Sequence, residues 1–360
     1  MTRVLVVSAD PGIPLYGPSG SSAHLRGMIR SFAGAGHEVV VAVPRLADAR
    51  GASGDDVVPA RVVTHTPRRW GIVPRRWRER GEGWDADRLV ARALAEVHPE
   101  LIYERHALWC VAGAAAQRRL GVPRIVELNA PLARERAQLG GLRDVAGAEA
   151  RERASLRAAT RVNAVSAWLA RWAVEEAGCD PSRVAHVPNG VTWFGPGQRD
   201  ATRQRLGLTG LVVGFVGSMK AWHGVDRIPA FLDHVPGATA LVVGDGPIQL
   251  PEHPRLRAVG RVPPRQVGDY VAAMDVALAP YRSDAPPWFC PLKLLEYRAQ
   301  GVPIVAADVG DCAALVGPEG VALTTDDPAA WAAEITAAAA RPRRPFVRSW
   351  DDVLAEALAR

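Results

Sequence analysis

The sequence predicts an α/β protein made of two tandem Rossmann-like domains that face a central cleft. Short apolar, β-branched runs alternate with amphipathic helical stretches, an order typical of parallel sheets covered by helices. The chain of 360 residues is longer than one hydrophobic core requires and is long enough for two domains. A Gly/Pro-rich stretch at residues 195–199 precedes a second series of strands and helices, so we place the domain boundary between residues 194 and 195.

The first domain opens with a strand–loop–helix–strand unit. Residues 4–8 form an apolar strand, the Gly/Pro/Ser-rich loop 11–22 follows, and apolar residues recur on one face of a helix at 23–35 before a strand at 38–43. The loop lacks a full G-x-G-x-x-G pattern, but a Gly/Ser-rich loop after a strand is where an open α/β sheet places its ligand. Further strands are expected at 61–65, 101–104, 124–128 and 161–166, and further helices at 86–97, 107–120 and 148–159.

The second domain repeats this alternation. A strand at 211–216 runs into Gly217, and a basic, irregular segment at 341–348 precedes a terminal helix at 350–358. The remaining strands are expected at 239–243, 256–262, 276–279 and 304–307, with a helix at 265–274.

The stretch from Pro291 to Ala306 is the most informative, and it predicts a helix followed by a buried strand. Pro291 suits the first helical turn, and Gly301 marks the end of the helix. Lys293 and Glu296 are three residues apart and therefore lie on one side of the helix, near its N-terminal end. A helix N-terminus beside a lysine favours an anion, and a carboxylate one turn later can accept hydrogen bonds from sugar hydroxyls. Considered alone, this helix is explained better by an ordinary Lys–Glu pair on the surface than by a ligand-binding site.

Composition limits the class of protein. No apolar run approaches the roughly 20 residues that span a bilayer, and residues 1–11 lack the length and cleavage site of a secretory signal, so we expect a cytoplasmic protein. The four cysteines have no paired spacing, which argues against a zinc site and against a disulfide framework, and we expect no metal.

Arginine carries most of the net charge of +6. No helix-turn-helix, zinc-finger or RNA-binding signature accompanies this charge, so we expect no nucleic-acid partner. A solvated arginine-rich surface is the simplest explanation. The alternative is a weak peripheral contact with the inner face of the membrane through the segment from Arg68 to Arg80, in which Trp70 and Trp77 are interleaved.

Residues of the C-terminal half form a set suited to binding phosphate. Gly217 and Ser218 end a strand where backbone N–H groups can approach a phosphate closely. Lys220 and His223 follow at short spacing, and the helix that carries Lys293 adds its N-terminus and a positive charge. Together these parts describe a pyrophosphate clamp that uses side chains and helix ends and needs no metal.

Short motifs follow one another across almost the whole chain. In the N-terminal half they are residues 17–20 with His24, 36–40, 102–106, 126–132, Ser166 and 188–191. In the C-terminal half they are residues 215–218, 222–225, 244–247, 260–262, 279–281 and 291–306. In this order they resemble the GT-B-fold retaining glycosyltransferases of the family 4, group 1 type, which include sucrose synthases and bacterial mannosyltransferases.

The resemblance implies roles for domains and residues. Residues 1–194 would form the acceptor side, residues 195–340 would bind the nucleotide sugar, and residues 341–360 would pack back on the first domain. The implied donor-binding residues are Gly17, Gly20, Gly217, Ser218, Val262, Leu292 and Glu296. The implied catalytic residues are Lys220, His223, Lys293 and Asn129, and His24 and Glu127 would face the cleft or the acceptor.

Three positions depart from the family pattern. Glu296 matches the second glutamate of the E-x7-E motif, but Phe289 stands where the first, sugar-contacting glutamate is expected. His223 precedes Gly224 where the family usually has lysine, so Lys220 or His223 must supply the charge. Asn129 replaces an active-site histidine and can hydrogen-bond the sugar, but it cannot act as a base.

The resemblance implies a metal-independent, retaining transfer of a sugar from a nucleotide diphosphate sugar to an acceptor hydroxyl. We expect UDP or GDP rather than dTDP as the nucleotide, no cofactor besides this co-substrate, and an acceptor from polysaccharide, glycolipid or natural-product biosynthesis. The absent carboxylate at Phe289 keeps two alternatives open. One is a non-catalytic nucleotide-sugar or carbohydrate-binding protein, and the other is a GT-B nucleotide-sugar epimerase.

Overall fold

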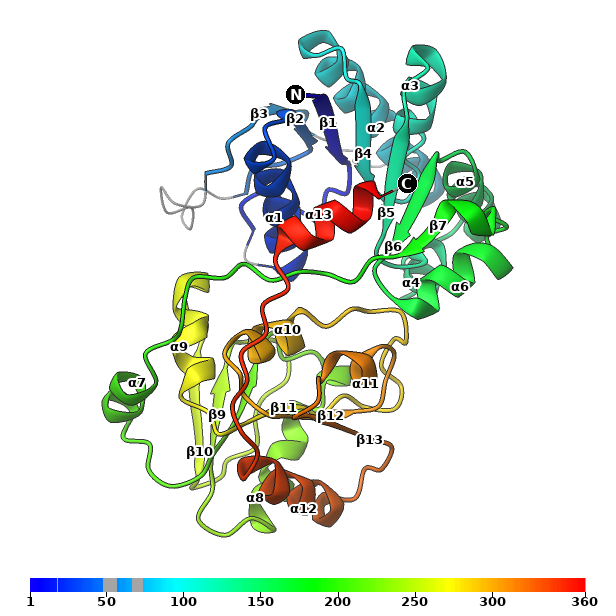
Figure 1. Cartoon of the computed structure of the whole chain (residues 1–360). Coiled ribbons are helices and arrows are strands. Elements are labelled where there is room, and N and C mark those ends of the chain that lie inside the picture. Colours follow the sequence, from blue (N-terminus) through cyan, green and yellow to red (C-terminus); the bar gives the residue numbers. More distant parts are fainter. Residues whose placement is uncertain (18, 48–56, 67–73, 360) are drawn as a thin grey trace. The chain divides into compact units, whose positions relative to one another are not determined.

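The structure, a computed structural model, describes residues 1–17, 19–47, 57–66 and 74–359 (Figure 1). It divides into two compact units, of which unit 1 comprises Met1–Gly190 with Trp350–Arg360 and unit 2 comprises Val191–Ser349. Each unit holds one parallel sheet with helices packed on it, so the prediction of two Rossmann-like α/β domains is confirmed. Residues 341–349 belong to unit 2 and only the residues from Trp350 onward belong to unit 1, whereas the sequence placed both in one segment.

Unit 1 is built on a seven-stranded parallel sheet with the order β3-β2-β1-β4-β5-β6-β7. The chain moves outward from β1 to β3 and then returns to the other side of β1, so the strand order reverses between β1 and β4. Open α/β sheets bind ligands beyond the carboxyl ends of the strands at such a reversal. The strands are β1 (Arg3–Ser8), β2 (Glu38–Val43), β3 (Arg61–Thr64), β4 (Leu101–Arg105), β5 (Arg124–Leu128), β6 (Arg161–Ala164) and β7 (Val184–His186).

The helices of unit 1 follow from this strand order. Right-handed crossovers put α1 on one face and the helices between β3 and β7 on the other, because the chain reverses its direction across the sheet. The helices are α1 (Gly20–Gly34), α2 (Arg75–Glu96), α3 (Ala112–Leu120), α4 (Leu132–Gln138), α5 (Val145–Arg157) and α6 (Ala167–Glu175). Helices α4 and α6 were not predicted from the sequence. The predicted start of α1 was three residues too late, that of α2 was eleven residues too late, and that of α3 was five residues too early.

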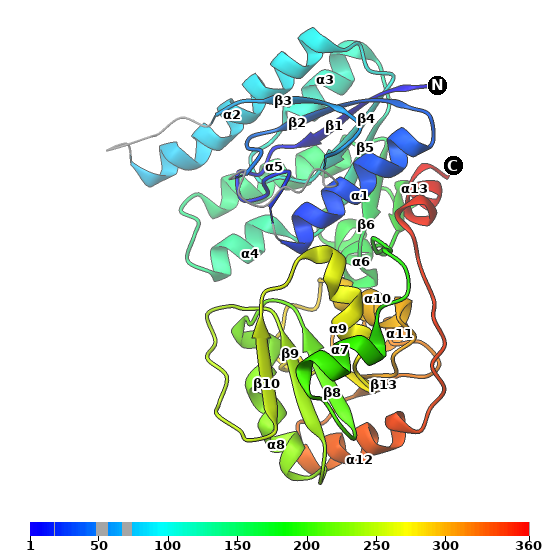
Figure 2. The same cartoon turned by 90° about the vertical axis from the view of Figure 1, so that its left-hand side faces the viewer.

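Helix α13 (Trp350–Leu358) completes the face that carries α1 (Figures 1 and 2). Asn163 on β6 donates a hydrogen bond to the carbonyl of Ala357 at 3.1 Å. The indole of Trp350 lies against Gly27 of α1, where any side chain would collide with the ring. The far end of the chain therefore covers the part of the sheet that the crossovers leave bare.

Unit 2 repeats the plan with six parallel strands in the order β10-β9-β8-β11-β12-β13, which reverses between β8 and β11. Helix α12 packs beside α8, and the rings of Phe231 and Trp331 stack at 4.8 Å between centroids. The strands are β8 (Val212–Val216), β9 (Thr239–Val243), β10 (Leu256–Gly260), β11 (Val276–Ala279), β12 (Ile304–Ala307) and β13 (Val321–Leu323). The helices are α7 (Arg199–Leu206), α8 (Ile228–Asp233), α9 (Val267–Ala272), α10 (Leu292–Ala299), α11 (Cys312–Leu315) and α12 (Pro328–Ala339). Short 3-10 helices are η3 (Pro181–Arg183) in unit 1, and η4 (Ala221–His223), η5 (Val225–Arg227) and η6 (Pro264–Gln266) in unit 2.

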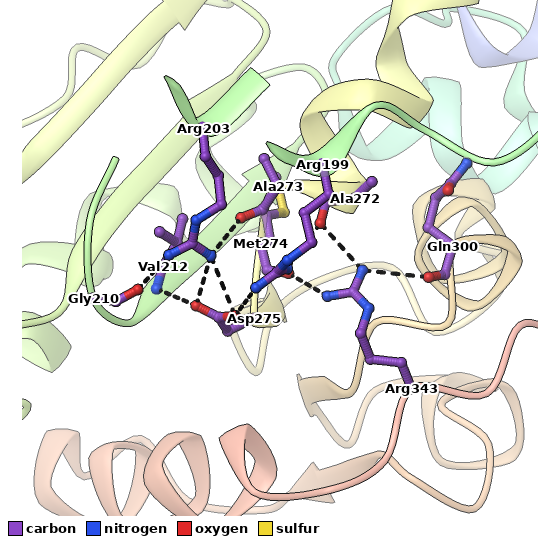
Figure 3. A network of polar contacts seen from close by, with 10 residues as sticks. All are labelled: Arg199, Arg203, Gly210, Val212, Ala272, Ala273, Met274, Asp275, Gln300 and Arg343. Carbon is purple, nitrogen blue, oxygen red and sulfur yellow. Dashed lines mark hydrogen bonds and ion pairs between the residues drawn. The ribbon is translucent and has the colours of Figure 1, made fainter. Parts of the chain in front are cut away.

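Three arginines anchor the first and last segments of unit 2 at one place (Figure 3). Arg199 and Arg203, from the first helix of the unit, both bind the carboxylate of Asp275. Arg343, near the end of the unit, donates to the carbonyl of Met274 at 2.7 Å. The carbonyls at the end of α9 and the Asp275 carboxylate thus hold both segments on the same edge of unit 2, which explains why residues 341–349 belong to this unit.

Candidate functional site

The carboxyl ends of β8 and β9 form a tight pair of glycine turns in unit 2. Gly217 has φ +135° and Gly244 has φ +124°, conformations that side chains strongly disfavour. A Cβ on Gly244 would collide with the carbonyl oxygen of Gly217. The N–H of Gly217 donates to Val243 at 2.9 Å, and that of Met219 donates to Asp245 at 2.9 Å. The Gly217 amide, which the sequence analysis expected to face a phosphate, is therefore already bonded within the protein.

Helix α10 begins beside these turns because Tyr297 ties it to both strands at the reversal. The buried Tyr297 hydroxyl accepts the N–H of Val216 at 2.8 Å and donates to the carbonyl of Leu278 at 3.2 Å. Pro291 is the N-cap residue and provides no side-chain cap. The first N–H groups of the helix, at Leu292 and Lys293, have no acceptor within the helix itself.

Lys293 has a buried ammonium group that forms no hydrogen bond with any of the described residues. Its side chain is 8% exposed, and its Nζ has no hydrogen-bond partner in the part of the chain that the structure describes. Nζ lies 3.9 Å from the centre of the Phe215 ring and 3.1 Å from where a Cβ of Gly217 would be. Burial lowers the pKa of Lys293 to about 7, an effect that Glu296 partly offsets and Lys220 reinforces. Such a group needs an anion, since an unpaired buried charge is costly.

Glu296 lies one turn after Lys293 on α10 and is partly exposed. Burial raises the pKa of Glu296 to about 7, against the opposing effect of Lys293. Near neutral pH the carboxyl group is therefore protonated in a large fraction of molecules, and in that form it both donates and accepts hydrogen bonds. Ribose hydroxyls need both kinds of partner.

His223 was one of two residues expected to supply the positive charge, but its environment favours the neutral ring. Its Nδ1 donates to the carbonyl of Ser218, and the ring is buried. Burial, with Lys293 and Lys220 nearby, lowers the pKa of His223 to about 3 despite the bond to Ser218. Lys293 and the exposed Lys220 therefore carry the positive charge of this site.

Aromatic side chains lie around the buried Lys293. The Tyr281 ring lies 5.1 Å from Lys293 Nζ and 4.7 Å from the Phe289 ring. The Trp222 ring lies 5.0 Å from Phe289 and stacks on Tyr281. Phe289, at the position of the expected carboxylate, is thus part of an aromatic wall. The half-buried Val262 follows the end of β10 and packs on the same core.

In unit 1 the predicted residues His24, Glu127 and Asn129 meet at one buried carboxylate. Glu127 accepts bonds from His24 Nε2 at 2.8 Å and from Asn129 Nδ2 at 2.7 Å. It also accepts bonds from the Tyr103 hydroxyl at 2.6 Å and the Arg105 guanidinium at 2.7 Å. Burial alone would raise the pKa of Glu127, but its hydrogen-bonded partners, above all His24 and Arg105, hold that pKa well below its usual range.

The Glu127 cluster is suited to support rather than to proton transfer. Its carboxylate is saturated by four donors, and burial lowers the pKa of His24 while raising that of Tyr103. The His24 ring also lies 4.6 Å from the Trp350 ring, so α13 covers the cluster. Tyr103 and Arg105 were not among the predicted site residues. Their alternation in an apolar strand was a signal, because alternate residues share one face of β4.

The loop from Gly17 to Gly20 is only partly described, since residue 18 lies outside the described residues. Gly17 is buried, and its carbonyl accepts a bond from Arg26 at 3.1 Å. Gly20 is the exposed first residue of α1, which Ser19 caps by accepting the N–H of Ser22 at 3.2 Å. This loop follows β1, beside the reversal of the strand order.

The remaining expectations concern metal and membrane. Within residues 1–17, 19–47, 57–66 and 74–359, no group of three or more His, Cys, Asp or Glu side chains is placed to hold a metal ion. Among the helices of those residues, none has the length and apolar character to cross a bilayer. Of the segment proposed for membrane contact, residues 67–73 lie outside the described part, while Trp77 is 43% exposed on α2.

Family models match both halves of the chain. The model described as Glycosyltransferase Family 4 matches residues 18–192, and the model described as Glycosyl transferases group 1 matches residues 210–341. The first match lies in unit 1, and the second lies in unit 2 and includes the Lys293 site.

Curated proteins similar to this chain are named as glycosyltransferases. The D-inositol 3-phosphate glycosyltransferase of Geodermatophilus obscurus is 34% identical over 211 residues, which are 51% of this chain and 46% of that protein. The enzyme of the same name, number 1, from Catenulispora acidiphila is 28% identical over 276 residues, 68% of this chain and 65% of that protein. The chain thus spans between about half and two thirds of the length of the relatives it matches.

Solved structures share the fold. HepE of Anabaena, in complex with UDP and glucose, superposes with a TM-score of 0.70 at 21% identity and covers 99% of both chains. Sucrose-phosphate synthase from Thermosynechococcus elongatus superposes with a TM-score of 0.70 at 19% identity and covers 99% of this chain and 97% of that one. The two-unit architecture is therefore that of the GT-B fold.

Proposed function

This chain belongs to the glycosyltransferases of the family 4, group 1 type, and we propose that it transfers a sugar from a nucleotide diphosphate sugar to the hydroxyl group of an acceptor. The observation that carries the proposal is the buried Lys293 ammonium, which lacks a hydrogen-bond partner among the described residues. It lies at the carboxyl end of β8, next to the reversal of the strand order, where sheets of this kind bind ligands. A pyrophosphate is an anion suited to that position, and the HepE neighbour was solved with UDP.

In the proposed reaction, the bond between the anomeric carbon and the β-phosphate oxygen breaks, and its electron pair stays on that oxygen. The acceptor oxygen bonds to the anomeric carbon, and its proton passes to the departing phosphate. Lys293, Lys220 and the first N–H groups of α10 stabilise the growing negative charge. Attack from the same face as the leaving phosphate would retain the anomeric configuration, and His223, with its pKa lowered to about 3, is too weak a base to compete for the proton.

The nucleoside is proposed to extend from Lys293 toward Glu296, whose partly exposed carboxyl group would bind the ribose. The base would then pass near Val262, which follows β10. We propose UDP or GDP as the nucleotide. The sugar would extend the opposite way, toward the aromatic wall of Trp222, Tyr281 and Phe289.

The proposed function is tested by incubating the chain with UDP-, GDP- and dTDP-sugars and measuring release of the nucleoside diphosphate. A glycosyltransferase hydrolyses its donor slowly even without an acceptor, whereas an epimerase converts a UDP-sugar without releasing UDP. Binding of a nucleotide sugar with neither release nor transfer to any acceptor would indicate the non-catalytic alternative. That alternative has one observation in its favour, which is the lack of a carboxylate at Phe289.

Donor binding is expected to weaken as pH rises above about 7. The pKa of Lys293 is lowered to about 7, so the cation that attracts the pyrophosphate is lost above that pH. Affinity for a nucleotide sugar should fall by up to about tenfold per pH unit there for the proton of Lys293, and loss of the Glu296 proton, whose pKa is also about 7, should steepen the fall. Isothermal titration between pH 6 and 9 measures this slope. A nucleotide sugar is the suitable probe because its pyrophosphate does not titrate in this range, and a flat profile would contradict the assignment of Lys293.

Phe289 is expected to contribute to binding of the sugar and not of the nucleotide. Changing Phe289→Ala removes one ring of the aromatic wall, and a lost aromatic contact of about 1 kcal/mol corresponds to roughly fivefold weaker binding. Affinity for the best donor of the panel should fall by that factor, while affinity for its nucleoside diphosphate stays unchanged. The matched control is Phe346→Ala, which removes an exposed ring that contacts Arg298 elsewhere in unit 2. Equal losses for donor and nucleoside diphosphate would place Phe289 outside the sugar site.

A further inference from the structure

We propose that unit 1 carries a separate binding site for a saccharide ring of the acceptor, in a cavity walled by tryptophans. The cavity measures about 200 Å³ and lies between α2, the loop that follows β4, and α5. Trp77, Trp84 and Trp109 are among the residues that line it. The proposal rests on the proposed function only in calling this saccharide the acceptor, since the cavity itself is defined by unit 1 alone.

One wall is a face of α2 that presents large aromatic side chains to solvent. Trp77, Arg80, Trp84 and Asp87 recur at three- and four-residue spacing, so they share one side of the helix. Trp77 is 43% exposed and Trp84 is 48% exposed, and neighbouring exposed tryptophans are typical of binding surfaces. Gly83 keeps this wall close to the opposite one, since a Cβ there would lie 2.9 Å from the carbonyl oxygen of Trp109.

The opposite wall contains Trp109, which has a strained backbone conformation and an indole N–H without a hydrogen-bond partner among the described residues. Trp109 has φ +68°, a left-handed conformation that side chains seldom adopt. Its buried indole N–H has no hydrogen-bond partner among the residues that the structure describes. Strained, unsatisfied residues of this kind concentrate at functional sites. The loop that carries Trp109 follows β4, one of the two strands between which the order of the sheet reverses, where a ligand is expected.

The polar groups of the cavity match hydroxyl groups. The Arg80 guanidinium lies 5.6 Å from the Trp77 ring, and that of Arg151 lies 5.7 Å from the Trp109 ring. Guanidinium groups only donate hydrogen bonds, the Asp87 carboxylate accepts them, and a sugar hydroxyl does both. The indole faces are negative and attract the C–H face of a sugar ring. Because the cavity is smaller than the roughly 300 Å³ at which sites for drug-sized ligands begin, it fits one ring and not a polycyclic molecule.

The cavity walls are held in place by the helices themselves. The buried Glu79 carboxylate on α2 accepts the N–H of Arg143 at 2.9 Å and that of Asp144 at 3.2 Å. Arg80 pairs with Asp144 at 3.1 Å, and Asp144 caps the start of α5. These bonds fix α2 relative to α5, so the site is preorganised and a ligand does not have to order it.

The test uses the full chain and millimolar methyl α-glucoside, methyl α-mannoside and methyl β-galactoside, detected by saturation-transfer NMR and by tryptophan fluorescence. We expect at least one glycoside to bind. Trp84→Ala and, as a substitution less able to disturb folding, Asp87→Asn should each weaken that binding about fivefold or more, the size expected for one aromatic or polar contact. Trp168→Ala is the matched control. The Arg134 guanidinium lies 5.5 Å from the centre of the Trp168 ring, and neither residue lines the cavity. UDP binding should remain unchanged in all three variants.

Several results would overturn the proposal. If no glycoside binds while UDP does, or if binding is equal in Trp84→Ala, Asp87→Asn and the unchanged chain, the cavity is not a saccharide site, and the proposed transferase function is unaffected. If the chain instead sediments with phosphatidylserine vesicles, and Trp77→Ala and Trp84→Ala abolish this, the surface is a membrane contact. Glycoside binding without any binding of UDP or nucleotide sugars would support the cavity and contradict the proposed function.

Discussion

Replacing Lys293 with methionine is expected to reduce donor turnover by on the order of 10²-fold or more while stabilising the protein without ligand. The ammonium is the buried positive charge nearest the Gly217 turn, and removing one such contact to a leaving group typically costs that factor. Methionine is an unbranched side chain one atom shorter than lysine, so it fills most of the space between Phe215 and Tyr281 and removes the charge, for which the described residues supply no hydrogen bond. Turnover, nucleotide affinity and the thermal unfolding midpoint of both proteins measure the effect.

The gain in stability should depend on pH in a defined direction. The folded-state pKa of Lys293 is lowered from 10.5 to about 7, so the buried charge reduces the free energy of unfolding by its full amount at every pH below about 7. As pH rises from 7 to 10.5 the folded chain loses this proton before the unfolded chain does, and the penalty fades. A shift of this size corresponds to a few kcal/mol, on the order of 1.4 kcal/mol per pKa unit. Lys293→Met should therefore be stabilised most at pH 6 and least near pH 10.

Lys220→Met is the control for Lys293→Met. Lys220 is exposed and lies over the Trp222 ring at 5.7 Å, so removing its charge should not raise the unfolding midpoint. A moderate loss of nucleotide affinity is expected, because its positive charge also faces the site. If Lys293→Met binds nucleotides as well as the unchanged chain does, the donor site lies elsewhere. If it binds poorly but is also less stable, the description of Lys293 as an uncompensated charge is wrong.

The change Glu127→Gln is expected to destabilise unit 1 by about 3–5 kcal/mol, the usual cost of breaking a buried ion pair by removing one charge. Glutamine has the shape of glutamate but leaves the buried Arg105 without its counter-charge. One glutamine oxygen also cannot replace both carboxylate oxygens, to which His24, Tyr103, Arg105 and Asn129 all donate. Urea unfolding, followed by the fluorescence of the chain, measures the loss.

Glu96→Gln is the matched control for Glu127→Gln, because Glu96 pairs with Arg61 at 3.2 Å on the surface of the same unit, where both side chains are at least half exposed. That change should cost less than about 1 kcal/mol. Nucleotide binding by unit 2 should survive in Glu127→Gln at temperatures where unit 1 remains folded. A small effect on stability together with a complete loss of transfer would instead make Glu127 a participant in the reaction.

The predictions that held depend on local sequence. Short apolar runs between Gly and Pro residues predicted the buried parallel strands, because a strand covered on both faces is apolar throughout. Lys293 and Glu296 lie on one helix, α10, as the three-residue spacing predicted, while their roles in donor binding stay a prediction. Helices α4 and α6 were missed because they are short and follow strands closely; Ser166, which was assigned to a strand, in fact caps α6 by accepting the N–H of Leu169 at 3.2 Å.

The state of each site residue depended on long-range contacts. Glu127 and His24 were expected to face the cleft or the acceptor. The hydrogen bonds that saturate Glu127 come from residues as far as 103 positions away in the sequence. His223 was expected to supply positive charge. Burial of the ring and the nearby Lys293 and Lys220 lower its pKa and favour the neutral form, although the bond to the Ser218 carbonyl acts in the opposite direction. The periodicity of apolar residues does not show whether a residue at the end of a strand is buried, nor which groups surround a titratable side chain. The protonation states and hydrogen-bond partners of Glu127, His24 and His223 could therefore not be predicted from the sequence.

The sequence by itself determined the two α/β domains, their family resemblance and the position of helix α10, because these follow from local patterns of apolar, glycine and charged residues. Only the tertiary structure decided that the Lys293 ammonium has no hydrogen-bond partner among the described residues, that Phe289 completes an aromatic wall and that three tryptophans line one cavity. The physical reason is that desolvation and pairing depend on what surrounds a group in space. Those surroundings come from strands and helices that lie far apart in the chain.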